Sequence, residues 1–155
     1  MHDTMETGVR KRQEEFPGNA PAHLAWLTEE LIPHVDQLME FPSTYNAIAG
    51  YSLAGLFALW CAWNTDMFSR IGCGSASLWY PGFVEYAEAH PMKRLPEYIY
   101  FSLGDNESDT RHPVMRQVGR CTDQILELTS RLHIPHTCEV NPGNHFSDPD
   151  GRLAK

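Results

Sequence analysis

The sequence lacks any apolar stretch long enough to span a bilayer: its longest, residues 53–63, falls well short of the roughly 20 residues that a transmembrane helix needs. Residues 1–15 mix charges around no apolar segment, so no signal peptide is expected. Basic residues are also few, with 12 Lys plus Arg against 20 Asp plus Glu and a net charge of −8. Such a charge repels phosphate backbones and anionic lipids, which argues against nucleic acid or a membrane as a partner.

Cysteine is scarce and dispersed, with no C-x-x-C pair and no Cys/His spacing of a zinc site. The four cysteines are Cys61, Cys73, Cys121 and Cys138. Their pattern predicts reduced, mostly buried thiols in a cytoplasmic protein. Asp148-x-Asp150-Gly151 resembles the start of a calcium loop but lacks the later bidentate acid, so we expect a polar turn there.

Length and composition are those of one globular domain. The 155 residues are 42% hydrophobic, 11% aromatic and 21% charged, which excludes a disordered or fibrous protein. A chain of this size buries about 70% of its unfolded surface, enough for one core. Residues 1–18 are polar and aperiodic, and we expect them to form a poorly ordered tail.

Hydrophobic periodicity predicts an alternation of helices and strands. The expected helices are residues 21–38 with a kink at Pro33, residues 53–63, a short one within 79–90, and residues 115–132. The expected strands are residues 45–49, 69–74, 98–103 and 136–140. This order indicates an α/β protein with a mostly parallel sheet covered on both faces, and ligand sites at the carboxyl ends of its strands.

The segment Gly50-Tyr51-Ser52-Leu53-Ala54-Gly55 lies between a predicted strand and a predicted helix. A serine in so tight a turn adopts a strained backbone that presents its hydroxyl at the sheet edge, while small neighbours let the turn close. The backbone N–H groups that open the helix would face a developing oxyanion. The pattern predicts that Ser52 is a nucleophile. A packing turn in which serine merely caps the helix is the alternative.

A serine nucleophile needs a histidine base and an acid that orients it. In serine hydrolases built on such a sheet, the acid and then the histidine follow on loops after later strands. Gly104-Asp105-Asn106-Glu107 follows the strand at 98–103, and Gly143-Asn144-His145-Phe146 follows the strand at 136–140. His145 is therefore the candidate base. On spacing alone, Asp105 and Glu107 both remain candidates for the acid.

These residues resemble the esterases of the α/β-hydrolase superfamily that include esterase D and the enterochelin (siderophore) esterases. The resemblance runs from about residue 22 to the end of the chain. It rests on residues 29–33, 50–59, 75–79 and 143–146. It implies Ser52 as the nucleophile, His145 as the base and, from the Gly-x-x-Asp/Glu register, Glu107 as the acid. It also implies the N–H of Leu53 as one oxyanion donor.

The sequence also departs from these esterases, which carry several strands before the nucleophile turn and a covering helix after the histidine. Residues 19–155 are therefore expected to be the C-terminal part of an α/β-hydrolase domain, with no candidate for the second oxyanion donor. Loss of one such donor typically costs about 10²- to 10³-fold in rate. An uncovered sheet edge favours self-association, so a homo-oligomer is one expected outcome.

The favoured hypothesis is a serine esterase that cleaves a small-molecule carboxylic ester through an acyl-enzyme. No metal or cofactor is expected, because this esterase hypothesis requires neither. Tyr51 and Trp79 are the residues assigned to substrate binding. Tyr80, Phe83 and Phe146 could line an aromatic-accepting pocket with Trp79, although aromatic residues in such positions often belong to the core. The alternative hypothesis is a non-catalytic α/β-hydrolase-like fragment that acts as a binding module.

Overall fold

The structure is a computed structural model that describes residues 18–154. The chain divides into two compact units, Met1–Pro42 and Ser43–Lys155. Apart from Gly18, the expected tail of residues 1–18 lies outside the described residues. Within residues 18–154, no helix is both long enough and apolar enough to cross a membrane.

The first unit is helical over the predicted range. It consists of α2 (Ala20–Trp26), a π-helical segment η1 (Leu27–Leu31) and α3 (Ile32–Leu38). Pro33 lies in the first turn of α3, directly after the π-helical segment. In a regular helix its ring would clash with the carbonyl four residues earlier, and its missing N–H would leave that carbonyl unpaired. The wider π turns before Pro33 are the local adjustment that lets the helix continue past it.

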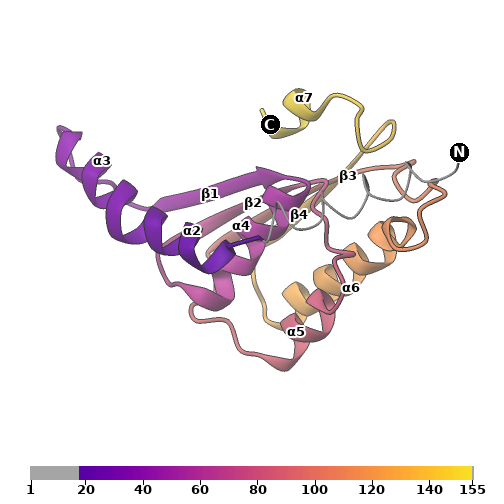
Figure 1. Ribbon diagram of the computed structural model, residues 1–155, viewed down its shortest axis with the longest axis horizontal. Helices are drawn as coiled ribbons and strands as arrows, with labels where there is room; N and C mark the ends of the chain where they lie inside the picture. Colours follow the sequence, from indigo (N-terminus) through magenta and orange to yellow (C-terminus); the bar gives the residue numbers. More distant parts are fainter. Residues whose placement is uncertain (1–17, 155) are drawn as a thin grey trace, which may run out of the picture. The chain divides into compact units, whose positions relative to one another are not determined.

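The second unit is built on one four-stranded parallel sheet in the order β1-β2-β3-β4 (Figure 1). Its strands are β1 (Asn46–Tyr51), β2 (Phe68–Gly74), β3 (Tyr98–Gly104) and β4 (His136–Asn141). Its helices are α4 (Leu53–Asn64), α5 (Phe83–Ala89), the 3-10 turn η2 (Met115–Gln117), α6 (Val118–Arg131) and α7 (Pro149–Leu153). The α/β class and the predicted strands are confirmed. Because all strands are parallel, their carboxyl ends meet at one edge.

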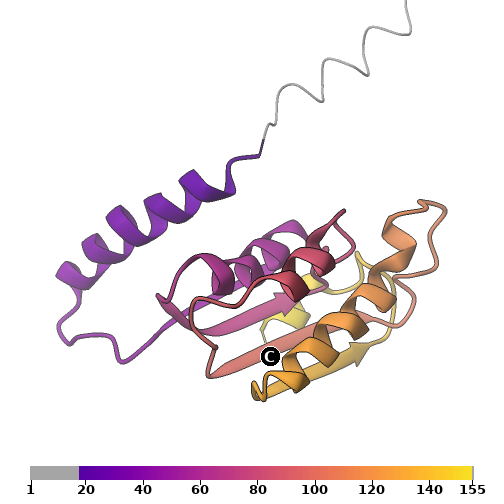
Figure 2. The same cartoon turned by 90° about the horizontal axis from the view of Figure 1, so that it is seen from below.

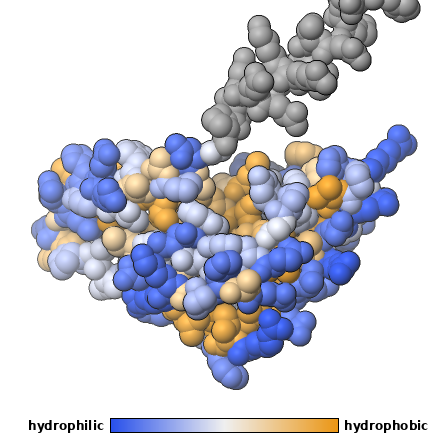
Figure 3. Space-filling model, turned by 60° about the horizontal axis from the view of Figure 1, so that its bottom comes forward, coloured by the Kyte–Doolittle hydropathy of each residue, from blue (hydrophilic) through white to orange (hydrophobic). Residues whose placement is uncertain are grey.

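The core lies between the sheet and the helices α4, α5 and α6, which cover the same face (Figure 2). Alternate residues of the central strands supply it, including Ile71 and Cys73 of β2 and Ile99 and Phe101 of β3. Helix α4 is apolar on most sides and buries six residues, which places it tightly against β1 and β2. On this side of the molecule, hydrophilic side chains predominate between smaller apolar patches (Figure 3).

The opposite face of the sheet carries polar side chains of β3 and β4, and helices lie on both faces of the sheet, as the sequence predicted. Among the described residues of the second unit, α7 is the helix that lies on this face (Figure 1). Tyr98 bonds Thr137 across the strands, and Tyr100 donates to Glu139 at 2.9 Å. Burial, followed by the hydrogen bond to Glu139, raises the pKa of Tyr100. The alternating Tyr-Ile-Tyr-Phe pattern of β3 thus marks one apolar face and one polar face.

The expectation of a polar turn at residues 148–151 was wrong, because this segment begins helix α7. Asp148 is its N-cap and its Oδ1 accepts from the Gly151 N–H at 3.2 Å, while Pro149 occupies the first turn. An acidic cap followed by proline is a helix-start signal, because the carboxylate satisfies a free N–H and proline needs no acceptor there. The acidic residues of this segment therefore begin a helix.

Candidate active site

Ser52 sits in the turn between β1 and α4, with φ 59° and ψ −120°. This is a sparsely populated conformation for a residue with a side chain. The turn closes because its glycines leave room: a Cβ on Gly55 would lie 2.8 Å from the Gly50 oxygen, and one on Gly50 would overlap the backbone of Ala54. The Ser52 side chain makes no capping hydrogen bond to the helix, so capping does not explain it.

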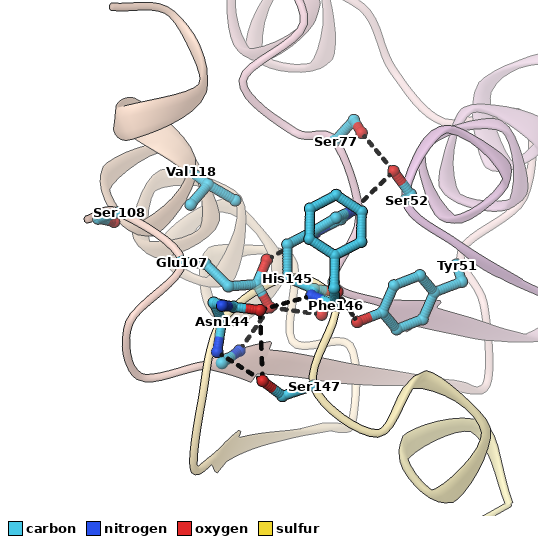
Figure 4. A network of polar contacts seen from close by, with 12 residues as sticks. Tyr51, Ser52, Ser77, Glu107, Ser108, Val118, Asn144, His145, Phe146 and Ser147 are labelled. Atoms are coloured by element: carbon cyan, nitrogen blue, oxygen red, sulfur yellow. Dashed lines mark hydrogen bonds and ion pairs between the residues drawn. The ribbon is translucent and has the colours of Figure 1, made fainter. Parts of the chain in front are cut away.

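Three side chains from different loops form one hydrogen-bonded chain (Figure 4). The Ser52 Oγ lies 3.0 Å from the His145 Nε2, and the His145 Nδ1 lies 3.0 Å from the Glu107 Oε2. Ser52 follows β1, Glu107 follows β3 and His145 follows β4, so the parallel sheet brings residues 93 positions apart together. A serine, an imidazole and a carboxylate in this order are arranged for nucleophilic catalysis.

Of the two candidate acids, Glu107 is the one that contacts the histidine. Its side chain is 1% exposed and its Oε1 accepts from the Gly104 N–H at 2.7 Å and the Ser75 hydroxyl at 2.6 Å. Asp105 instead accepts from the Gly143 N–H at 2.8 Å and so ties the β3 loop to the β4 loop. Glu107 is therefore the acid in contact with His145, whereas Asp105 joins two loops.

Two groups beside Ser52 can serve an oxyanion. Leu53 is the first residue of α4, so its backbone N–H has no acceptor within the helix. The buried Ser77 hydroxyl lies 3.3 Å from the Ser52 Oγ, and the Ser77 N–H donates to the Ser52 carbonyl at 2.9 Å. Ser77 has no role in the sequence-based prediction, although it lies within the segment 75–79 that resembles the esterases.

A second residue without a sequence-based assignment is Arg152 of α7. Its guanidinium is buried and pairs with the Glu107 Oε1 at 2.9 Å. The sequence offers one indirect signal, the helix start at Asp148-Pro149, which would have placed Arg152 on a helix near the His145 loop. Spacing alone could not indicate its partner.

Tyr51 and Trp79, the predicted substrate-binding residues, lie at two different places in the second unit. Tyr51 donates its hydroxyl to the His145 carbonyl at 2.7 Å, and its ring lies 5.4 Å from the imidazole. Trp79 lines a cavity of about 430 Å³ against the start of α6, whose lining includes none of Ser52, Glu107 and His145. Substrate binding by both residues stays a prediction.

The other aromatic candidates differ in how much of each side chain is exposed. Phe83 is 6% exposed and belongs to the core, so it does not line an open pocket. Tyr80 is 53% exposed. Phe146 is 82% exposed and its ring packs edge-on against His145 at a centroid distance of 5.1 Å (Figure 4). Phe146 thus presents a free aromatic face beside the histidine.

The thiols and the carboxylates outside the site suggest no further chemistry. Cys61 and Cys73 are buried, Cys121 and Cys138 are half-buried, and all four are free. Burial raises the pKa of the Cys61 thiol to about 12. It also raises the pKa of Cys73 above its ordinary value. Within residues 18–154, no cluster of His, Cys, Asp and Glu has the grouping that a metal ion needs.

The parallel sheet and the loops at its carboxyl edge define the class: this chain has an α/β-hydrolase-like fold. The family model described as "Putative esterase" matches residues 2–148, so the chain belongs to this esterase family. No curated protein sequence matches the chain. The resemblance to enterochelin and siderophore esterases is confirmed.

Solved structures share the fold at low sequence identity. Enterochelin esterase from Shigella flexneri aligns with a TM-score of 0.70 and 23% identity, over 98% of this chain and 38% of that one. The siderophore hydrolase EstB from Aspergillus nidulans aligns with a TM-score of 0.66 and 22% identity, over 88% and 56%. A ferulic acid esterase aligns with a TM-score of 0.62 and 16% identity, over 85% and 56%. The chain thus spans between 38% and 56% of the length of these proteins.

Proposed function

We propose that this chain hydrolyses carboxylic esters of small molecules through an acyl-enzyme on Ser52. The observation that carries the proposal is the unbroken contact from the Ser52 Oγ through His145 to Glu107, with both distances at 3.0 Å. The esterase family and the hydrolase fold support the same reaction. No residue of the proposed mechanism requires a metal or a cofactor.

In this mechanism the Ser52 Oγ attacks the ester carbonyl carbon while its proton passes to the His145 Nε2. The oxyanion that forms accepts from the Leu53 N–H at the start of α4. Collapse of the tetrahedral intermediate breaks the bond to the alcohol, and His145 returns the proton to the departing oxygen. Water then attacks the acyl-serine by the same route and releases the acid. Glu107 accepts from the Nδ1–H and thereby fixes the tautomer whose Nε2 is free to take a proton.

We propose further that the preferred substrates carry an aromatic acyl group. Two fold neighbours support this: one is named a ferulic acid esterase, and an enterobactin esterase from Shigella flexneri was solved with 2,3-dihydroxy-N-benzoyl-glycine. In this chain, Phe146 offers an exposed ring beside His145. Stacking of an aromatic acyl group on that ring would add about 0.5–1.5 kcal/mol, or roughly 2- to 12-fold in rate.

Labelling with a fluorophosphonate probe tests the nucleophile directly. We expect labelling of the wild type and none of Ser52→Ala or His145→Ala, with circular dichroism confirming that each variant folds. Ser130→Ala is the matched control, because Ser130 is an exposed helical serine that bonds the Leu126 carbonyl. Labelling that survives Ser52→Ala would refute the assignment.

Competing esters test the substrate class. With methyl ferulate and methyl octanoate as the pair, we expect Phe146→Ala to lower kcat/KM about 2- to 12-fold for the aromatic ester alone. Equal losses for both esters would contradict the stacking role. A folded wild type that neither labels nor turns over any ester would favour the alternative, a non-catalytic binding module.

A further inference from the structure

The guanidinium of Arg152 is a buried charge that the reaction scheme above does not use. Its side chain is 2% exposed, yet it comes from α7, five residues long, next to the C-terminus. The Leu153 side chain of this helix lies close to β2, since a Cβ on Gly74 would meet it at 3.0 Å. Arg152 thereby reaches the space behind Glu107 and His145.

The two terminal nitrogens of Arg152 contact the two loops that bear Glu107 and His145. Nη1 donates to the Glu107 Oε1 at 2.9 Å. Nη2 donates to the carbonyl of Asn144 at 3.1 Å and approaches that of Pro142 at 3.5 Å, both in the loop that bears His145. Nη1 also reaches the Tyr51 hydroxyl, which itself donates to the His145 carbonyl. A planar guanidinium can hold both loops at once, because its donors point in fixed directions.

The contacts of Glu107 divide between its two oxygens. Oε1 accepts from the Gly104 N–H, the Ser75 hydroxyl and the Arg152 Nη1. Oε2 faces the His145 Nδ1. Three donors on one oxygen fix the plane of the carboxylate and leave the other oxygen for the imidazole. The positive charge of Arg152 also offsets the negative charge of the buried Glu107 carboxylate.

We infer that Arg152 is a positioning residue of the ester hydrolysis. Its guanidinium fixes the position of the Glu107 carboxylate relative to the loop that bears His145. This inference rests on the proposed function. It predicts that loss of the Arg152 guanidinium misplaces the His145 base without altering where the substrate binds. Misplacement of a catalytic group by about 1 Å can cost about 100-fold in rate, and this sets the scale of the expected effect.

The test compares Arg152→Lys and Arg152→Met in the full chain with p-nitrophenyl acetate as substrate. Lysine keeps the charge but offers a single nitrogen, so it cannot hold both loops. Rates are normalised to the folded fraction measured by circular dichroism. We expect kcat to fall about 10-fold in Arg152→Lys and about 100-fold in Arg152→Met, with KM within about twofold of wild type. Arg131→Met is the matched control, because Arg131 is half-exposed and pairs with the surface carboxylates of Glu88 and Glu127.

The pH profile separates positioning from a loss of folded protein. The ionisable groups around His145 are Glu107 at its Nδ1, Arg152 behind that carboxylate and Tyr51 beside the ring; Asp105 bonds the same loop through the Gly143 N–H. Without Arg152 the full charge of Glu107 acts on the imidazole, so Arg152→Met should move the acid limb of kcat/KM to higher pH. Partial unfolding would lower the whole profile and leave that limb in place.

Each outcome decides the inference. Reduced kcat in folded Arg152→Lys, together with a shifted acid limb in Arg152→Met, supports it. Wild-type kcat in both variants overturns it, and so does an Arg152→Lys protein that fails to fold, because Arg152 would then serve stability alone. If the wild type itself shows neither turnover nor fluorophosphonate labelling, the proposed function fails, and that result is distinct from both.

Discussion

Replacement of Glu107 by glutamine is the sharpest test of the proposed triad. The Oε1 position is surrounded by donors from Gly104, Ser75 and Arg152, so an amide NH₂ cannot occupy it without facing all three. The amide oxygen must therefore take that position, and the NH₂ must take the position of Oε2. It would then point at the His145 Nδ1, 3.0 Å away in the wild type.

That orientation reverses the histidine tautomer. The Nδ1 would have to accept, which puts the proton on Nε2, and a protonated Nε2 cannot take the proton of Ser52. In serine proteases this tautomer error lowers kcat about 10⁴-fold, and we expect a loss of that order in Glu107→Gln. The variant also leaves the buried Arg152 without its counter-charge, at a cost of about 3 kcal/mol in the free energy of unfolding.

The assay is the second-order rate of fluorophosphonate labelling, normalised to the folded fraction from a urea titration. Asp105→Asn is the matched control, because its amide oxygen can still accept from the Gly143 N–H. We expect it to keep its rate within about threefold, because the amide preserves the hydrogen bond that joins the two loops and Asp105 does not contact His145. A large loss in Asp105→Asn beside an active Glu107→Gln would refute the assignment of the acid.

Three further outcomes are expected. Ser77→Ala should slow labelling about 2- to 10-fold, the worth of one neutral hydrogen bond at 3.3 Å from the Ser52 Oγ; an unchanged rate would exclude Ser77 from the oxyanion site. Gly55→Ala should lower the free energy of unfolding by about 1–3 kcal/mol in a urea titration, because its Cβ would lie 2.8 Å from the Gly50 oxygen; a wild-type midpoint would contradict this packing. At pH 8, a Cys61 pKa of about 12 leaves about one thiolate in 10⁴, so Ellman's reagent should reach Cys61 and Cys73 only after unfolding; rapid reaction of four thiols in the native protein would argue against their burial.

The strands and the nucleophile turn could be predicted because their signals are local. The aromatic and branched side chains of residues 98–103 predicted a strand, and β3 spans Tyr98–Gly104. The turn at Ser52 was recognisable because small residues have to stand at fixed positions around it. Chain order then indicated the loops after β3 and β4, since parallel strands end at one edge.

The remaining features depend on contacts between distant segments. Spacing could not separate Asp105 from Glu107, because both lie on one loop and differ only in what their side chains meet. The role of Arg152 was equally hidden, because Glu107, its partner, is 45 positions away.

Backbone strain at Ser52 opposes stability to the proposed esterase activity. Glycine adopts φ 59° and ψ −120° more readily than serine does, so Ser52→Gly would relieve on the order of 1 kcal/mol while it removes the hydroxyl. A selection for heat resistance alone would therefore enrich inactive variants at this position. Thermostable forms that keep the site have to gain their stability outside the turn, for instance on the exposed surfaces of α3 and α6.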